Sequence, residues 1–255
     1  MKSIRLVGWN TFLELLRNRI LFGIVVFAIL LMSLSVLLGQ LSFAEQARIT
    51  IDFGLTAIQL SSAMLSIFVG STLISREVEK QTILSLLVRP MSRLQFLLGK
   101  ALGLTMVNLL VVLSLALCFL FILLFWGIPL TASLFLGLLG ILLESLVVLG
   151  VALFFSTMSA TFMVVAFTFG IWLIGHWMES LEHFSSRSQS KSFEILSTAV
   201  QHIFPNLEKF NWSIQAVYGD LISLGQISYA LLYAVGWFGL LITLAFLNFR
   251  RRDFV

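Results

Sequence analysis

The chain has 255 residues, of which 59% are hydrophobic and 11% are charged, and its mean hydropathy is +1.04. Soluble domains carry roughly 25% charged residues, so this chain lacks the polar groups that a water-facing surface needs. Its net charge of +4 comes from basic residues that flank apolar segments, a pattern of membrane topology and not of nucleic-acid binding. The composition predicts a membrane protein and argues against a soluble domain.

Six segments are apolar enough to cross the bilayer, since a helix of about 20 residues spans its hydrocarbon core. We place these spans near residues 20–41, 53–74, 97–125, 131–155, 162–177 and 227–249, the fifth being the shortest. The predicted fold class is therefore an all-α, polytopic membrane protein. Residues 1–255 are expected to form a single transmembrane domain.

Residues 3–18, before the first span, have an amphipathic pattern at helical spacing. Ile4, Val7, Gly8, Phe12 and Leu15 share one face, and Asn10, Glu14, Arg17 and Asn18 share another. A helix of this kind next to a span is expected to lie in the membrane interface.

The segment between the second and third spans is charged at first and then apolar at helical spacing up to Pro90. Because the residue before a proline disfavours helical angles, that helix should end there. Ser92 and Gln95 have the spacing of a capping box, so a new helix should begin at this point and run into the third span. The segment is either a cytoplasmic helix that docks a soluble partner or an ordinary amphipathic connector.

Small residues recur at every fourth position in two spans. Ser62, Ser66 and Gly70 follow this spacing in the second span, and Gly99 and Gly103 at the start of the third. Such residues let helices approach closely. We expect packing within the chain, with a dimer seam as the alternative.

Glu144 is the only acidic residue deep in a predicted span. A carboxylate at the bilayer centre costs about 2.5–3.5 kcal/mol on insertion scales. It is predicted either to line a transport pathway or to make a polar contact between helices, with Gln59 or Asn108 as partner. The alternative is a protonated or water-reached carboxyl group that only holds helices together.

No catalytic or metal site is predicted. A metal site needs ligands at close, regular spacing, and a nucleophile needs a neighbouring base. The three histidines, His176, His183 and His202, are too scattered for either role and are expected at the surface or the interface.

Residues 178–226 form a polar stretch of near-neutral charge between the last two spans. Pro205 and Asn206 interrupt this stretch. We expect short helices resting on the outer membrane interface, where Trp212 and Tyr218 would act as aromatic anchors.

Basic residues are distributed unevenly between the two sides of the spans. They gather before the first span, between the second and third, and after the last. Arg48, Arg187, Lys191 and Lys209 are the four of the 16 that fall on the opposite side. Since cytoplasmic segments carry the excess of Lys and Arg, both termini are predicted to be cytoplasmic, in a multi-pass protein of a bacterial inner membrane.

A sequence pattern in the central loop resembles a known family. Residues 74–82 read I-x-R-E-x-E-x-x-T, and R-P-x-S-R at 89–93 and L-G-K at 98–100 follow. This pattern resembles the cytoplasmic loop of type-2 ABC exporter permeases, above all the multi-copper-enzyme-maturation branch, which includes the nitrous-oxide-reductase maturation permease. Three more segments resemble parts of that family, namely residues 14–19, 204–211 and 249–254.

The resemblance implies an exporter in which two permease chains pair, as a homodimer, and each contacts one ATP-binding subunit. The central loop would then be a coupling helix that transmits the motion of the ATPase. The residues implied at the ATPase contact are Arg76, Glu77, Glu79, Lys80, Gln81 and Thr82 in the loop, with Glu14 and Arg17 in the first helix. The turn 156–161 would be a secondary contact, and residues 178–226 could dock an accessory protein outside the membrane.

The chain has no recognisable nucleotide site of its own. A phosphate-binding loop needs G-x-x-x-x-G-K-[ST], and the one Gly-Lys pair, Gly99-Lys100, is followed by Ala101. We therefore expect a non-catalytic subunit that binds no cofactor, with ATP and Mg²⁺ on the partner chain.

Two other functions are weighed against the exporter permease. A stand-alone secondary transporter would show inverted repeats and several polar groups at mid-membrane. An intramembrane enzyme would need a nucleophile–base pair or a metal set within the spans. Neither pattern is visible in this sequence.

Overall fold

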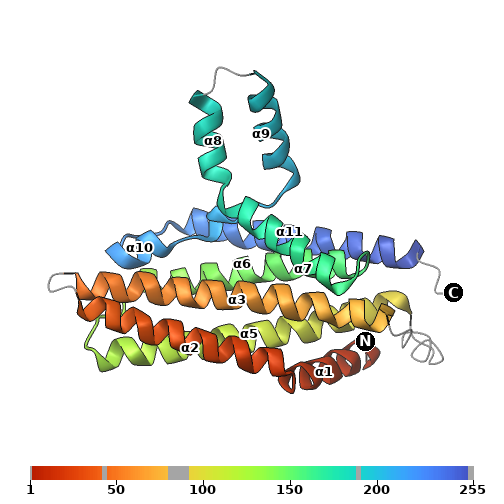
Figure 1. Cartoon of the computed structure of the whole chain (residues 1–255), viewed down its shortest axis with the longest axis horizontal. Coiled ribbons are helices and arrows are strands. Elements are labelled where there is room, and N and C mark those ends of the chain that lie inside the picture. Colours follow the sequence, from red (N-terminus) through yellow and green to blue (C-terminus); the bar gives the residue numbers. More distant parts are fainter. Residues whose placement is uncertain (1, 42–44, 80–91, 188–190, 252–255) are drawn as a thin grey trace.

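The apolar segments become helices at nearly the predicted positions. The computed structural model describes residues 2–41, 45–79, 92–187 and 191–251, and all regular structure within these ranges is helical (Figure 1). The helices are α1 (Lys2–Leu16), α2 (Arg19–Gln40), α3 (Gln46–Glu79), α5 (Arg93–Phe125), α6 (Ala132–Ser156), α7 (Thr161–His176), α8 (Met178–Arg187), α9 (Lys191–Ile203), η1 (Glu208–Phe210), α10 (Ser213–Tyr218) and α11 (Leu224–Arg251). The predicted all-α fold is confirmed for these residues.

Five helices are long and apolar enough to cross a membrane, namely α2, α3, α5, α6 and α11. A sixth crossing results only if α7 and α8, which are bent by 53° relative to each other, are taken as one broken span. The structure therefore supports five or six of the predicted spans, and the uncertain one is the fifth. α1 and the end of α11 lie at the same end of the bundle (Figure 1).

α6 lies at the centre of the bundle and packs against α3, α7, α10 and α11. The small residues of α3 make this packing close, as the sequence predicts. The Ser66 hydroxyl donates a hydrogen bond to the Ser145 carbonyl at 2.9 Å, and Gly70 lies against the Ala152 side chain. The stripe on α3 therefore serves packing within the chain.

α5 begins where the capping-box prediction places it. The Ser92 side chain accepts a hydrogen bond from the Gln95 amide, and the Gln95 side chain accepts one from the Ser92 amide. The first turns of α5 then pack against α1 through two glycines. A Cβ atom at Gly99 would lie 2.7 Å from the Val7 side chain, and one at Gly103 would lie 2.6 Å from the Gly8 carbonyl oxygen.

The predicted apolar face of α1 is the face that packs against α5. Gly8 and Leu15 are buried, whereas Asn10, Glu14 and Arg17 are exposed. Leu6 and Trp9, on a third side of the helix, are 58% and 53% exposed. That α1 lies in the membrane interface stays a prediction.

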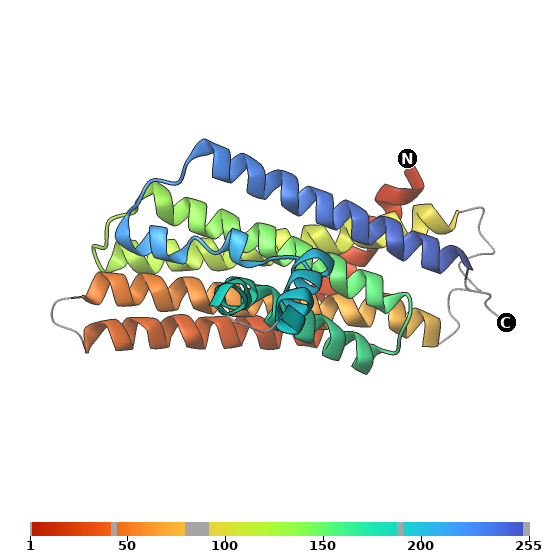
Figure 2. The same ribbon diagram turned by 90° about the horizontal axis from the view of Figure 1, so that it is seen from above.

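α7 is too short to cross a bilayer alone. Its 16 residues make about 24 Å of helix, against about 30 Å of hydrocarbon. At its end the chain turns away from the bundle and forms α8 and α9, which pair with each other and which we call the arm. Figure 1 shows the arm standing nearly perpendicular to the bundle, and Figure 2 shows its helices nearly end-on.

After the arm the chain returns to the bundle and runs along α6. The Leu207 amide donates to the Gly175 carbonyl at 3.1 Å, the Phe210 backbone lies against Gly140, and Ala216 lies against Gly137. These contacts run from the end of α7 towards the start of α6. The chain after the arm thus lies along α7 and α6 as a mostly irregular segment.

The prediction that Trp212 anchors the chain at the outer interface is wrong. Its side chain is only 7% exposed and lies against Gly140 of α6. Because Gly140 has no side chain, the backbone of Phe210 and the ring of Trp212 can approach α6 directly. Tyr218 is 62% exposed, with the Arg48 guanidinium 5.0 Å from its ring centroid.

Candidate functional site

A buried carboxylate lies in the middle of the bundle. Glu144, halfway along α6, is 2% exposed. It faces α3 and α7, because Gln59, Trp172 and His176 extend to it from those helices. We call these four residues the polar cluster.

The carboxylate of Glu144 accepts hydrogen bonds at both oxygens. The Gln59 side-chain amide donates to Oε2 at 2.7 Å, and the Trp172 indole N–H donates to Oε1 at 2.9 Å. His176 Nε2 lies 3.4 Å from Oε1. Each bond links a different helix to α6, so the cluster joins α3, α6 and α7 at one level.

Both ring nitrogens of His176 lie within hydrogen-bond distance of a neighbour. Nδ1 lies 3.0 Å from the Trp172 carbonyl, which can only accept, so Nδ1 carries the proton. Nε2 lies 3.0 Å from the Gln59 amide nitrogen, which donates. The Gln59 amide and the Trp172 indole thus both donate to the carboxylate, and the His176 ring lies beside them.

Asn108 does not join the cluster. Its amide donates to the Ser145 hydroxyl at 2.7 Å, one residue along α6 from Glu144. Since Ser66 bonds to the carbonyl of the same serine, Ser145 links α3, α5 and α6. The structure therefore places Gln59, and not Asn108, beside Glu144.

Trp172 and His176 were missed by sequence reasoning. They lie four residues apart on α7, with ring centroids 4.7 Å apart, so they share one face of that helix. The available signal was this spacing, together with a buried acid that needs donors. The sequence predicts His176 at the surface or the interface, and this prediction is wrong, because its side chain is only 17% exposed and lies in the bundle.

Those of the other predicted residues that the structure describes lie at the end of the bundle that holds α1. Glu14 and Arg17 are exposed, and a Glu14 oxygen lies 3.8 Å from Lys100 Nζ, whose side chain is buried. Arg76, Glu77 and Glu79 belong to the last turns of α3, but their side chains lie outside the described structure. Lys80, Gln81 and Thr82, with the predicted coupling helix, fall in 80–91, also outside it.

The turn 156–161 and the start of α5 are both tied to the end of α11. The Asn248 amide donates to Thr157 Oγ1 at 3.2 Å. Arg93 Nη1 donates to the carbonyls of Phe249 at 3.2 Å and Arg250 at 3.0 Å. A guanidinium at the C-terminal end of a helix satisfies its last carbonyls and favours its dipole.

We predict that Arg93→Ala loosens the last turn of α11 by on the order of 1 kcal/mol, because two terminal carbonyls lose a charged donor. Amide hydrogen exchange should rise about fivefold in residues 247–251 and stay unchanged in the first turns of α11. Arg93→Lys, which keeps the charge, should show a smaller rise. Equal exchange in all three proteins would contradict the role of Arg93.

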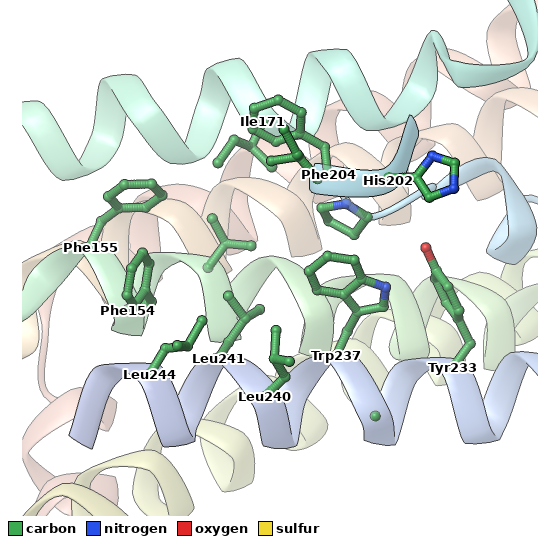
Figure 3. Close-up of a pocket in the computed structure, with 14 residues that line it drawn as sticks. Phe154, Phe155, Ile171, His202, Phe204, Tyr233, Trp237, Leu240, Leu241 and Leu244 are labelled. Carbon is green, nitrogen blue, oxygen red and sulfur yellow. The ribbon is translucent and has the colours of Figure 1, made fainter. Parts of the chain in front are cut away.

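A groove of about 660 Å³ lies between α6, α7 and α11 (Figure 3). Its lining is almost wholly apolar, with Phe154 and Phe155 from α6 and Leu240 and Leu244 from α11. His202 and Phe204, where the arm rejoins the bundle, close one end. Within the described part of the chain, no three His, Cys, Asp or Glu side chains are placed to hold a metal ion.

Comparison with known families gives one match over nearly the whole chain. The family model described as an ABC-2 family transporter protein matches residues 6–254. Comparison with curated proteins gives no match. A multi-pass helical bundle agrees with a transport component of the membrane. The chain belongs to the ABC-2 family of transporter proteins.

Proposed function

We propose that this chain is the permease subunit of an ABC exporter, and that a separate ATPase subunit supplies the energy. The family match over residues 6–254 carries the proposal. The complex would hold two permease chains, as a homodimer, and two ATPase subunits that bind ATP and Mg²⁺. We also propose that the chain belongs to the multi-copper-enzyme-maturation branch, which the central loop resembles.

The helix contacts at one end of the bundle support this function. Three described contacts meet there: α1 on the first turns of α5, Arg93 on the end of α11, and Asn248 on the turn 156–161. The start of α5 follows the segment that would contact the ATPase. Motion imposed on that segment would therefore reach α1, α5 and α11 together.

The topology of the proposal follows the distribution of Lys and Arg. Both termini and the central loop would be cytoplasmic, in a bacterial inner membrane. The exposed Leu6 and Trp9 on α1 would face the lipid interface, where aromatic and apolar side chains are stabilised. The start of α11, at the opposite end, would face the outside and any accessory protein.

The polar cluster would act as an inter-helix contact and not as a pathway lining. Glu144 is 2% exposed, and both its oxygens accept hydrogen bonds from other helices. A carboxylate that meets a passing substrate would need free acceptor positions directed towards an open channel. The groove next to α7 is lined instead by apolar side chains.

We predict that the chain co-purifies with an ABC ATPase in equal amounts. Reversing the charge of Glu77 and Glu79 together, as Glu77→Lys and Glu79→Lys, should lower the recovered ATPase about tenfold, because like charges at an interface repel. Asp220→Lys is the matched control, since Asp220 is exposed at the opposite end of the bundle. That variant should recover the ATPase normally.

Two outcomes would count against this proposal. Recovery of the chain without any ATPase, from membranes in which both are expressed, would remove the transporter assignment. Recovery that is equally weak in the Asp220 variant would show a general effect of charge and no specific contact.

A further inference from the structure

The polar atoms of the groove between α6, α7 and α11 lie towards one of its ends. Of the 14 residues that line it, three carry a polar side-chain atom, namely His202, Tyr233 and Trp237. Figure 3 shows His202 and Tyr233 at the end where the arm rejoins the bundle, and Phe155 and Leu244 at the other end. The groove is therefore amphipathic along its length, with hydrocarbon side chains over most of it and hydrogen-bonding groups at one end.

The Lys209 ammonium lies next to that polar end. Its Nζ is 4.5 Å from the ring centroid of Tyr233 and 4.8 Å from that of Tyr229, and it donates a hydrogen bond to the Tyr229 hydroxyl at 2.7 Å. Two aromatic rings and a hydroxyl thus hold the cation in place.

Lys209 keeps hydrogen-bonding capacity for an anion. Among the described residues it forms no ion pair with a carboxylate. The neighbouring acid, Glu208, accepts a hydrogen bond from the Asn211 amide at 3.1 Å. Because an ammonium has three N–H donors, the contact with Tyr229 leaves donors for a ligand at the end of the groove.

The dimensions of the groove match an acyl chain. It follows α11 from Tyr233 to Leu244, about 16 Å of helix, and one leaflet of the hydrocarbon core is about as thick, half of about 30 Å. Leu240 and Leu244, 51% and 40% exposed, leave the groove accessible from the side. A partner helix that crossed the membrane would be about twice as long as the groove, so a lipid chain fits it better than a second protein.

We infer that the groove binds an acyl chain of one anionic phospholipid and that Lys209 binds the headgroup of the same molecule. The apolar side chains of α6 and α11 cover the acyl chain, and the Lys209 ammonium donates to a phosphate oxygen. A hydrogen bond between two charged groups is stronger than one between neutral groups, and basic pockets between membrane helices are typical sites for anionic headgroups. A fatty acid has the same chemistry, but phospholipid is the amphiphile that surrounds a membrane protein. This ligand goes beyond the proposed function, because it concerns the permease alone.

Filling the groove gives the first test. Gly236 lines the groove, and apart from the adjoining residues and the backbone of its own helix no described atom lies within 4 Å of the position of its Cβ. Gly236→Phe should lower the amount of phosphatidylglycerol bound to the purified full-length chain about fivefold, measured by native mass spectrometry. Gly239→Phe is the matched control, since Gly239 has the same free space on the same helix but does not line the groove. It should bind the lipid as the natural protein does.

The choice of headgroup gives the second test. The natural protein should bind phosphatidylglycerol about tenfold better than phosphatidylcholine with the same acyl chains, because the choline group cancels the charge of the phosphate. Lys209→Gln should bind the two lipids about equally. Lys191→Gln removes the same charge at an exposed position of the arm and should keep the preference.

Four results would overturn the inference. Equal binding of phosphatidylglycerol by Gly236→Phe and Gly239→Phe would exclude the groove, and equal binding of the two lipids by the natural protein would exclude a role of Lys209. Displacement of phosphatidylglycerol by an equal concentration of oleate would assign the site to a fatty acid. Loss of a co-purified membrane protein from Gly236→Phe, with lipid binding unchanged, would assign the groove to a partner helix.

The outcome is independent of the proposed function. If Gly236→Phe does not reach the membrane fraction, the comparison of Lys209→Gln with Lys191→Gln decides the inference. A chain that binds phosphatidylglycerol as expected but recovers no ATPase would contradict the proposed function alone.

Discussion

Glu144→Leu is expected to destabilise the bundle by about 1–3 kcal/mol, measured as the thermal unfolding of the purified protein in detergent. The substitution removes the acceptor of the Gln59 amide and the Trp172 indole and leaves both donors without it. The loss should appear first at the end of α7, which these bonds hold against α3 and α6. Hydrogen bonds between membrane helices contribute less than this singly, so the effect depends on losing both together.

Glu144→Gln is the matched variant, because it keeps the size of the side chain and one acceptor oxygen. It should lose less stability than Glu144→Leu. Trp172→Phe removes one donor, and its effect should not add to that of Glu144→Leu, since both remove the same bond. Equal stability of the leucine and glutamine variants would show that the hydrogen bonds of Glu144 do not hold α7.

Gly103→Ala is expected to destabilise the protein by about 1–3 kcal/mol, the usual cost of adding volume to a closely packed contact. The new Cβ atom would lie 2.6 Å from the Gly8 carbonyl oxygen, a backbone atom that cannot rotate away. α1 must then move off α5. In a reconstituted complex, ATP hydrolysis should become uncoupled from transport if α1 transmits the motion of the ATPase.

Gly23→Ala is the control, since no described atom other than the adjoining residues and backbone of its own helix lies within 4 Å of the position of its Cβ. Alanine favours a helix over glycine by about 1 kcal/mol, so this variant should be as stable as the natural protein or slightly more stable. If both alanine variants behave alike, α1 does not pack on α5 through Gly103.

The sequence was sufficient for the features that depend on local pattern. The six apolar windows correspond to α2, α3, α5, α6, α7 and α11, and the capping box at Ser92 marks the start of α5. The spacing of Gly99 and Gly103 indicated a close contact, although not that α1 was the partner. Hydrophobicity, capping and small-residue spacing all act within one helix or at its ends, so they can be read without the fold.

The path of the chain after α7 could not be predicted in this way. A hydropathy window registers composition and not depth, so the polar stretch after α7 reads as lying outside the membrane. Residues near 205–218 lie along α6, where Gly137 and Gly140 leave room for another backbone. That complementarity joins residues about 70 positions apart, and it explains why the sequence alone predicts Trp212 as an interface anchor.

The membership of the polar cluster was also only partly predictable. Glu144 was identified because an acid in a span is conspicuous, and Gln59 was one of two candidates for its partner. Asn108 was equally plausible from its position in a span, but it lies over Ser145 on α6. Which side chain meets a carboxylate depends on the rotation of each helix about its axis, and a difference of one residue along α6 separates the two choices.

The fastening of α11 at one end has a mechanical consequence. Arg93 and Asn248 hold that end to α5 and to the turn 156–161, while much of the rest of the helix is uncovered within the chain. Its 28 residues make a rod about 42 Å long. Pivoting this rod by about 10° around its fastened end would sweep its free end through about 7 Å. A small rotation at one face of the membrane would thus become a displacement of more than a helical turn at the other.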